Sequence, residues 1–411
     1  MNSFDSDLEL ELGELRAQGL HRALRRVDSQ QGPKIVIKGR PLLNFSSNDY
    51  LGLATHPAVE EAACRAVSEF GAGAGASRLI CGSLAPHHEL ETALAEFKAT
   101  EAALAFSSGY STALGTIPAL VGKDDVIILD KLVHASIVDA ARLSGAKLRL
   151  FRHNDPASLE KVLKWARSRK SRTPHATRHT RLLIVTESVF SMDGDLAPLR
   201  EIIELKEQHG AWLLLDEAHA TGLFGEHRRG LAEAQELSGR VEIQMGTLGK
   251  ALGAAGGFIA GSRPLIELLV SRARSFIFST APVPAAAAAA TAAVRLVQSA
   301  EGDVLRTRLW QRVDELKNEL IRAGWSLPPV QSAILPLHVG DERKAVELAA
   351  GLRERGVFIP AIRYPSVARG AARLRVTVTA AHTSEHIAEL GRAMVHSKSE
   401  IRNPKSEIRN A

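Results

Sequence analysis

Hydrophobic positions in the middle of the chain form short continuous runs that alternate with helical stretches. Between about residues 50 and 280 these β-rich runs cover residues 103–106, 126–129, 148–151, 182–185, 212–215, 243–245 and 257–260. Continuous apolar runs separated by helices indicate strands that are buried on both faces of a largely parallel sheet. Such sheets bind ligands at the carboxyl ends of their strands. The pattern therefore predicts an α/β fold with its functional site at that edge.

The pattern changes on both sides of this region. Residues 1–50 have leucines at helical spacing followed by a short β-rich run, and we expect them to form an N-terminal arm. Residues 51–285 would make the large domain. Residues 286–397 combine a long helical region with shorter alternating segments, which predicts a smaller C-terminal α/β domain. In 398–411 the string Lys-Ser-Glu-Ile-Arg-Asn occurs twice, and we expect this tail to be disordered.

Composition is typical of a soluble globular chain. Of the 411 residues, 45% are hydrophobic and 24% are charged, which fits two or three domains. No apolar run reaches the roughly 18 residues that a membrane span needs, and the acidic N-terminus lacks the pattern of a secretory signal. Cys64 and Cys81 are too few for a disulfide framework. These features predict a cytoplasmic protein with no membrane partner.

A net charge of +6 is compatible with a partner that carries negative charge. Many basic residues lie between 161 and 181, among proline, serine and threonine. This composition is typical of a helix end and a solvated loop, with a polyanion site as the alternative. Trp165 is the one Phe, Tyr or Trp residue in the segment, so the stacking platform of a single-strand binding site is missing. We therefore expect no nucleic-acid partner.

The apolar run 212–215 leads into Asp-Glu-Ala-His at 216–219, a string that is compatible with two different functions. One is that of a nucleic-acid-dependent ATPase. Such an enzyme needs an upstream phosphate loop of the form Gly-x4-Gly-Lys-Ser/Thr, and the sequence contains no such string. Gly-Thr-Leu-Gly-Lys at 246–250 lies downstream and lacks both the spacing and the hydroxyl that would hold magnesium. The ATPase interpretation is therefore disfavoured.

The same string can instead serve an aromatic cofactor. Asp216 could keep a pyridinium nitrogen protonated, and His219 could reach a ring substituent. Lys250 could form a Schiff base with an aldehyde cofactor. Pyridoxal phosphate requires these parts because its protonated ring is the electron sink for a substrate carbanion. Each residue alone would fit a structural role, such as a helix cap for Asp216, so the hypothesis depends on all three together.

Three further polar clusters follow predicted strands. Ser-Ser-Gly-Tyr-Ser at 107–111 opens a helix whose backbone N–H groups would suit a phosphate, or it forms only a capping turn. His134 follows the run 126–129 and could stack on a cofactor ring, or pack as a structural histidine. Ser191 could hydrogen-bond a ring hydroxyl, or belong to a turn. Taken singly, these residues leave both interpretations open.

Five motifs in sequence order sharpen the interpretation. They are Asn-Phe-Ser-Ser-Asn-Asp-Tyr-Leu-Gly-Leu at 44–53, Ser-Met-Asp-Gly-Asp at 191–195, Asp-Glu-Ala-His at 216–219, Gly-Thr-Leu-Gly-Lys at 246–250 and Arg-Leu-Arg-Val-Thr-Val-Thr-Ala-Ala-His at 373–382. With these motifs the chain, from about residue 20 to residue 395, resembles the α-oxoamine synthases. These are pyridoxal-phosphate enzymes of the aspartate-aminotransferase fold (fold type I). They couple an amino acid to an acyl-CoA and release CoA and carbon dioxide.

The resemblance implies a role for each residue around the ring of pyridoxal 5′-phosphate. Lys250 would carry the cofactor, and Asp216 would pair with its pyridine nitrogen. His219 and Ser191 would bond the ring oxygen. His134 would stack on the ring and lie beside the substrate.

The resemblance also implies phosphate and substrate contacts. Thr247, with the backbone at Gly109 and Tyr110, would hold the phosphate. The substrate contacts would be Asn48 near the Schiff base, Arg375 on the amino-acid carboxylate, and Arg25 and Ser366 near the acyl group. A guanidinium suits a carboxylate because it makes a two-pronged contact. The resemblance implies a homodimer as well.

Within the family, residues 361–375 look most like the branch that joins L-alanine to a pimeloyl thioester. The donor would be pimeloyl-CoA or a pimeloyl-carrier protein, and the product 8-amino-7-oxononanoate, in biotin biosynthesis. Glycine C-acetyltransferase, 5-aminolevulinate synthase and serine palmitoyltransferase are the alternatives. Tyr364, Ser366, Tyr110 and Cys81 depart from the commonest pattern, and the first two lie where substrate choice is made. A cofactor-binding protein without catalysis and a nucleic-acid module are the alternatives outside the family.

Overall fold

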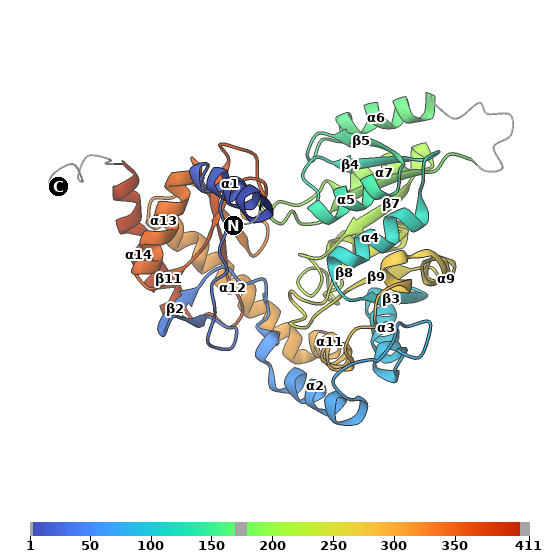
Figure 1. The fold of residues 1–411 in the computed structure, drawn as a ribbon, viewed down its shortest axis with the longest axis horizontal. Helices are drawn as coiled ribbons and strands as arrows, with labels where there is room; N and C mark the ends of the chain where they lie inside the picture. The colour runs from blue at the N-terminus through green and yellow to red at the C-terminus, as the bar shows by residue number, and fades with distance from the viewer. Residues whose placement is uncertain (1–2, 169–178, 403–411) are drawn as a thin grey trace. The chain divides into compact units, whose positions relative to one another are not determined.

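The computed structural model describes residues 3–168 and 179–402, and its backbone divides into two compact units (Figure 1). The larger unit comprises Asn48–Ser191 and Asp195–Arg308. The smaller unit comprises Met1–Ser47, Met192–Gly194 and Leu309–Ala411. The division falls within α12 (Ala300–Arg322).

The larger unit is built on a seven-stranded sheet in the order β3-β9-β8-β7-β6-β4-β5. Its strands are β3 (Ala102–Phe106), β4 (Val126–Asp130), β5 (Lys147–Phe151), β6 (Leu182–Glu187), β7 (Trp212–Asp216), β8 (Ile243–Thr247) and β9 (Gly257–Gly261). The five strands from β4 to β8 are parallel, and β9 runs antiparallel to both β3 and β8. The seven predicted strands and the mostly parallel α/β fold are thus confirmed.

The central strands are apolar at every position because helices cover both faces of the sheet. Ile127, Leu183 and Leu214 pack in one core cluster with residues of α4, α5 and α9, and their sequence neighbours Ile128 and Ile184 pack in a second cluster with α6 and α7. Successive side chains of a strand point to opposite faces, so an alternating polar pattern would expose polar groups to one of these layers. This explains the continuous runs in the sequence.

The helices of the larger unit connect these strands and flank the sheet. They are α2 (Pro57–Phe70), α3 (Ala85–Lys98), α4 (Gly109–Leu120), α5 (Ala135–Leu143), α6 (Pro156–Ser168), α7 (Leu199–His209), α8 (Leu231–Ala234), α9 (Arg263–Arg272), α10 (Arg274–Ile277) and α11 (Pro284–Val297), with 3-10 turns η1 (Leu53–Thr55) and η2 (Ser238–Arg240). Within the described residues, no helix is long and apolar enough to cross a membrane.

The smaller unit contains two three-stranded sheets, ordered β10-β13-β12 and β1-β2-β11. Its strands are β1 (Lys34–Ile37), β2 (Arg40–Asn44), β10 (Ile334–Gly340), β11 (Val357–Phe358), β12 (Ala361–Ile362) and β13 (Ala372–Thr377). Besides part of α12, its helices are α1 (Ser3–Ala17), α13 (Glu342–Glu354) and α14 (Ser384–Arg402).

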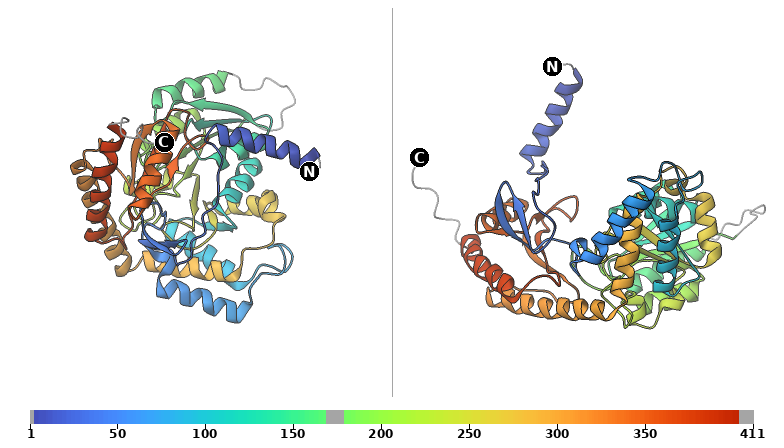
Figure 2. Two further views of the ribbon diagram at one scale, coloured as in Figure 1. Left: turned by 60° about the vertical axis from the view of Figure 1, so that its left-hand side comes forward. Right: turned by 90° about the horizontal axis from the view of Figure 1, so that it is seen from below.

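This division differs from the expected domain boundaries in three places. Residues 34–47 are not a separate arm, because β2 pairs with β11 and Thr377 donates its N–H to the Phe45 carbonyl. Helix α11 belongs to the larger unit because it lies along α2 and α3 (Figure 2). Helix α14 continues to Arg402 into the tail that was expected to be disordered, and the rest of that tail lies outside the described residues. Most of the basic loop between α6 and β6 also lies outside them.

A buried ion pair ties α3 to the end of β7. Lys98 Nζ lies 2.5 Å from Glu217 Oε2, and the two side chains are 0% and 1% exposed. The ammonium also donates to the Arg229 carbonyl, and Glu217 Oε1 accepts the N–H of Ala232. Glu217 is therefore fully used within the fold.

We expect Lys98→Met to lower the free energy of unfolding by about 3–5 kcal/mol, because it leaves the Glu217 carboxylate buried without its cation. Urea denaturation of the cofactor-free protein, followed by circular dichroism, measures this loss. The double variant Lys98→Met/Glu217→Gln should recover much of it, since neither charge then remains. A single variant as stable as the wild type would contradict the argument.

Candidate active site

Polar residues gather where the parallel strands of the larger unit end. Strand β6 ends at Glu187 and β7 at Asp216, and the two carboxyl groups are on paired positions of the sheet. Lys250 and His134 are both close enough to Asp216 to act electrostatically on its carboxyl group, which places these three groups in one environment. The structure therefore brings together Asp216, His134 and Lys250 from separate strand ends.

Asp216 is the central acid of this site. Its side chain is buried, and one oxygen accepts the N–H of Ala218 at 2.9 Å. Burial raises the pKa of Asp216, whereas the nearby Lys250 ammonium lowers it. A buried carboxylate needs a cationic neighbour to stay ionised. A protonated pyridine nitrogen would meet that need.

The side chain of His219 is held by Tyr50, a residue of the motif at 44–53 for which the sequence predicts no role. The Tyr50 hydroxyl lies 2.7 Å from His219 Nδ1 and 3.4 Å from Asn48 Oδ1, and the Tyr50 ring is 1% exposed. Because Nδ1 is engaged by Tyr50, the other nitrogen of His219 is the one that can serve a ring oxygen. The sequence feature that could have identified Tyr50 as a site residue is its place two residues after Asn48 in the motif at 44–53.

His134 caps the start of α5. Its Nδ1 lies 2.8 Å from the Ser136 hydroxyl and accepts the Ser136 N–H, so a neutral ring carries its proton on Nε2. Partial loss of hydration lowers the pKa of His134, and the charge of Lys250 lowers it further. The ring is nevertheless exposed to solvent, as a residue that stacks on a planar ligand must be before the ligand binds.

The start of α4, here called the α4 cradle, presents backbone N–H groups that suit a phosphate. Ser108 caps the helix, and its side chain accepts the Ser111 N–H. A Cβ atom at Gly257 would lie 2.8 Å from Gly109 N, and a Cβ atom at Gly109 would lie 3.8 Å from Thr247 Oγ1. Glycine at 257 thus lets β9 pack closely against the first turn of α4. The first N–H groups of a helix lack partners within the helix and attract anions.

Tyr110 reinforces this cradle. Its hydroxyl donates to Asp139 Oδ2 at 2.5 Å and so joins the first turn of α4 to α5. A phenylalanine could not make this bond. The departure from the family pattern at this position therefore has a structural explanation.

Glu187 is a further buried acid that sequence analysis missed. Its carboxyl group is 3% exposed and accepts backbone N–H bonds from both His134 and Ser191. Burial, with repulsion from Asp216, raises the pKa of Glu187 to about 8. Two adjacent buried carboxyls cannot both be ionised at low cost. With its pKa raised to about 8, Glu187 is the acid of this pair that would hold a proton, while the Lys250 ammonium favours the ionised form of Asp216.

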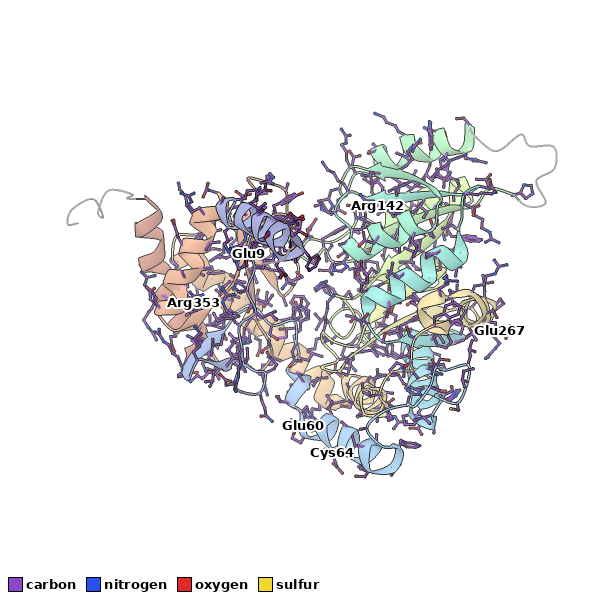
Figure 3. All side chains as sticks on the ribbon, viewed as in Figure 1. Glu9, Glu60, Cys64, Arg142, Glu267 and Arg353 are labelled. Carbon is purple, nitrogen blue, oxygen red and sulfur yellow. The ribbon has the colours of Figure 1, made fainter. Side chains whose placement is uncertain are left out.

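The smaller unit holds the other expected substrate residues. Arg375 is buried on β13, and its neighbour on the same face, Arg373, forms an ion pair with Asp193. Arg25 and Ser366 line one cavity of about 560 Å³. Three more arginines line it, Arg22, Arg363 and Arg353, the last labelled in Figure 3. The remaining lining is mostly apolar, with residues such as Leu24, Val346, Phe358 and Ile362.

The chain belongs to the aminotransferase class I and II family, whose model matches residues 40–394. Two of its most similar relatives are 8-amino-7-oxononanoate synthases. The one from Geobacter sulfurreducens is 46% identical over 95% of this chain and 97% of its own length. The one from Anaeromyxobacter dehalogenans is 49% identical over 92% of both chains.

Solved structures agree with this fold. A serine palmitoyltransferase from Sphingomonas wittichii superposes with a TM-score of 0.88, at 34% identity over 97% of this chain and 98% of its own. A serine palmitoyltransferase from S. paucimobilis with bound PLP–myriocin has a TM-score of 0.88, at 32% identity over 96% of this chain and 98% of its own. An 8-amino-7-oxononanoate synthase from Francisella tularensis has a TM-score of 0.73, at 25% identity over 88% of this chain and 99% of its own. The chain is thus a fold type I enzyme.

We expect Glu187→Gln to reduce the pH dependence of stability of the cofactor-free protein. The folded state raises this pKa from 4.5 to about 8, so it binds the proton more tightly than the unfolded chain. That stabilisation is complete below pH 4.5 and is lost as the pH rises towards 8, by at most about 1.4 kcal/mol per pH unit. Glutamine keeps the shape and cannot titrate.

Denaturation at several pH values from 5 to 8 tests this. The wild type should lose stability more steeply than Glu187→Gln across the range. Glu201→Gln, on the exposed surface of α7, is the matched control for the loss of one carboxylate. Equal slopes for the wild type and Glu187→Gln would show that Glu187 is ionised throughout.

Proposed function

We propose that this enzyme condenses L-alanine with a pimeloyl thioester, releasing carbon dioxide and the free thiol, to give 8-amino-7-oxononanoate in biotin biosynthesis. The observation that carries the proposal is the assembly of Asp216, His134 and Lys250 at one edge of the sheet, in a chain whose relatives over more than nine-tenths of its length are 8-amino-7-oxononanoate synthases. The reaction is that of an acyltransferase.

Pyridoxal 5′-phosphate supplies, when bound, an electron sink for negative charge at the substrate Cα. Asp216 would keep the pyridine nitrogen protonated, and His219 and Ser191 would bond the ring oxygen. The α4 cradle, with Gly109, Tyr110 and Thr247, would hold the phosphate. The residues fit the group because the buried Asp216 needs a cationic partner and the N-terminus of α4, beside Thr247, suits an anion.

Lys250 would hold the cofactor through Nζ and, once released, take the proton from the substrate Cα. An amine acts as a base only when it is neutral. The stacked His134 would cover the ring face, and Asn48 would lie near the reacting nitrogen. Arg375 would bind the amino-acid carboxylate through two parallel hydrogen bonds.

The cavity in the smaller unit supports a pimeloyl group as the acyl substrate. A pimeloyl chain is apolar along its length and ends in a carboxylate. The cavity combines apolar side chains with four guanidinium groups, among them Arg25 and Arg363. An uncharged palmitoyl chain could make no ion pair with these guanidinium groups. Ser366 would contact the acyl substrate from the same cavity wall.

A serine palmitoyltransferase is the second candidate, because chains of that activity superpose closely on this one. Glycine C-acetyltransferase is a further alternative within the family. The acyl donor is either a CoA or a carrier-protein thioester, and both carry phosphate or acidic groups that suit a basic protein. We place the reaction in the cytoplasm, where the free thiols of Cys64 and Cys81 stay reduced.

We propose a homodimer as the working form. In the larger unit, Ser77 and Thr280 form an isolated β-bridge. The segments on either side of this bridge expose Ile80, Leu79 and Phe278. Apolar side chains that gather on a surface mark an interaction site, and a second copy of the chain is the partner that would cover them.

An assay of thiol release tests the substrates. Alanine, glycine and serine are crossed with pimeloyl, acetyl, succinyl and palmitoyl thioesters. We expect the alanine–pimeloyl pair to have the highest kcat/KM. A preference for serine with palmitoyl, or for glycine with a short acyl group, would overturn the proposal.

We expect Arg25→Gln to raise KM for the pimeloyl thioester by about 10–100-fold, the loss expected for a hydrogen bond to a charged group, with little change in KM for alanine. Arg26→Gln is the matched control, because Arg26 pairs with Asp28 and does not line the cavity. An equal effect of both variants would indicate only a change in surface charge.

We expect borohydride reduction of the cofactor-loaded protein to attach the cofactor to the peptide that contains Lys250, as mass spectrometry can show. Lys250→Ala should give no such adduct. A reducible adduct that persists in this variant would place the cofactor on another lysine.

A further inference from the structure

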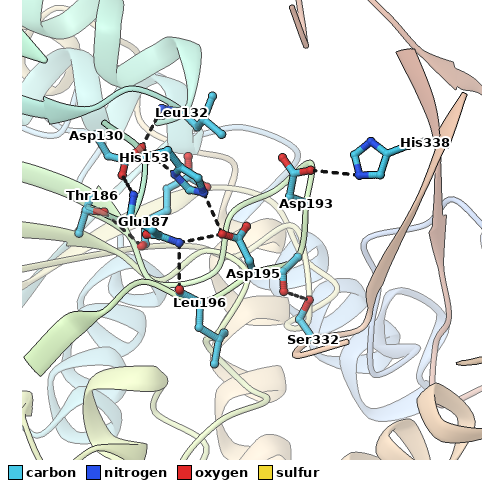
Figure 4. Close-up of polar contacts among 12 residues, drawn as sticks. Asp130, Leu132, His153, Thr186, Glu187, Asp193, Asp195, Leu196, Ser332 and His338 are labelled. Carbon is cyan, nitrogen blue, oxygen red and sulfur yellow. Dashed lines mark hydrogen bonds and ion pairs between the residues drawn. The ribbon is translucent and has the colours of Figure 1, made fainter. Parts of the chain in front are cut away.

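His153, just after β5, lies between two carboxylates (Figure 4). Its Nδ1 is 3.0 Å from Asp130 Oδ1, and its Nε2 is 2.8 Å from Asp195 Oδ2. An ionised carboxylate can only accept a hydrogen bond, so both ring nitrogens must donate and the ring is an imidazolium. Burial opposes this charge, but the bonds to Asp130 and Asp195 outweigh it and raise the pKa of His153 to about 10.

Asp130 begins the segment that leads to His134. Its side chain is fully buried at the end of β4, and Oδ1 also accepts the Leu132 N–H at 2.8 Å. Oδ2 accepts the Asn154 N–H at 2.9 Å. The carboxylate thus shapes the turn between β4 and the His134 cap of α5, while His153 holds the carboxylate.

Asp195 lies on the other side of His153, beyond the segment that carries Ser191. Its carbonyl accepts the Phe190 N–H at 3.0 Å, and its Oδ2 accepts from the Asn154 amide at 2.7 Å. The Phe190 ring packs against the His153 ring, with centroids 4.4 Å apart. His153 therefore contacts Phe190 and Asp195, which lie before and after Ser191 in the sequence, and so helps to fix the position of Ser191.

The same two segments are joined a second time at Glu187, which accepts the backbone N–H groups of His134 and Ser191. Glu187 accepts hydrogen bonds from the backbone of these two residues. His153 instead bonds Asp130 and Asp195, which lie in the turns that flank them. Two independent links between the same two segments indicate that their spacing matters. His134 and Ser191 are the residues that would contact the face and the edge of the cofactor ring.

We propose that the His153 imidazolium is a positioning residue, which holds the segments 130–134 and 190–195 together so that His134 and Ser191 meet the cofactor ring. The proposal rests on the proposed cofactor site. His153 itself would touch neither the cofactor nor the substrate. Its removal should loosen cofactor binding and change the environment of the ring while the fold is kept.

The test is His153→Gln, which keeps one donor and places an oxygen against one of the two carboxylates. We expect the affinity for pyridoxal phosphate to fall by about 10–100-fold, as for the loss of a charge-assisted hydrogen bond. The visible circular dichroism of the bound cofactor should weaken, because that signal reports how rigidly the ring is held. The KM for the acyl thioester, corrected for cofactor occupancy, should not change.

The double variant His153→Gln/Asp195→Asn separates positioning from general damage. The glutamine amide introduced at position 153 can donate to Asp130. The asparagine amide introduced at position 195 can donate to the glutamine carbonyl oxygen, so both links are restored with uncharged side chains at positions 153 and 195. We expect this variant to recover most of the affinity and dichroism. Arg152→Gln is the matched control, because Arg152 is an exposed neighbour that pairs with Asp155. Should His153→Gln not fold, Asp195→Ala alone removes the acceptor of His153 Nε2 and is measured in its place.

Wild-type affinity and dichroism in the folded single variant would overturn the proposal. So would a double variant that is no better than the single one, since the links would then not be the cause. These readouts need no acyl substrate. A failure of the pimeloyl assay with normal cofactor binding would therefore count against the proposed reaction and leave this inference standing.

Discussion

The ionised state of one buried carboxylate, Asp216, is the constraint on which the site depends. Asp216 lies at the end of the central strand β7 and is 5% exposed. Burial favours its neutral form, and only nearby positive charge reverses this preference. The Lys250 ammonium is the cationic group that acts on it, and Lys250 and His134 lie in the loops that follow β8 and β4. The parallel sheet is what brings these loops to one edge.

This constraint explains why the neighbouring acids differ in their partners. Glu217, next in sequence, forms an ion pair with Lys98 and accepts a hydrogen bond from the Ala232 N–H. Its charge is therefore neutralised within the fold. Glu187, on the neighbouring strand β6, is paired with Asp216, and its pKa is raised to about 8 by burial and by repulsion from Asp216. The string Asp-Glu-Ala-His thus contains one acid for the site and one acid for the fold. An ATPase would need its carboxylates near a nucleotide and a metal, and the burial of Glu217 against Lys98 does not provide this.

The sequence predicts the parts of this molecule that depend on local pattern. Apolar runs predict all seven strands of the large sheet. Asp216 ends β7 and Lys250 lies three residues after β8, so motifs at the strand ends can identify them. The pairing of β2 with β11 was not predictable, since β11 has only two residues and pairs with a strand more than 300 residues away. Glu187 and His153 likewise act through partners that are distant in sequence, and their roles need the register of β6 against β7 and the two distances from the His153 ring. Residues that position a site are therefore harder to predict than residues that occupy it.

The two units divide the chemical requirements of the proposed reaction. Acid–base groups with shifted pKa values lie in the larger unit, around Asp216 and Glu187. Guanidinium groups that suit carboxylates lie in the smaller unit, on β13 and around the cavity with Arg25. Proton transfer at Cα is common to every member of the family, whatever the acyl chain. Substitutions that change the acyl substrate should therefore concentrate around the cavity, where Tyr364 and Ser366 already depart from the family pattern, and should spare the carboxylate pair in the larger unit.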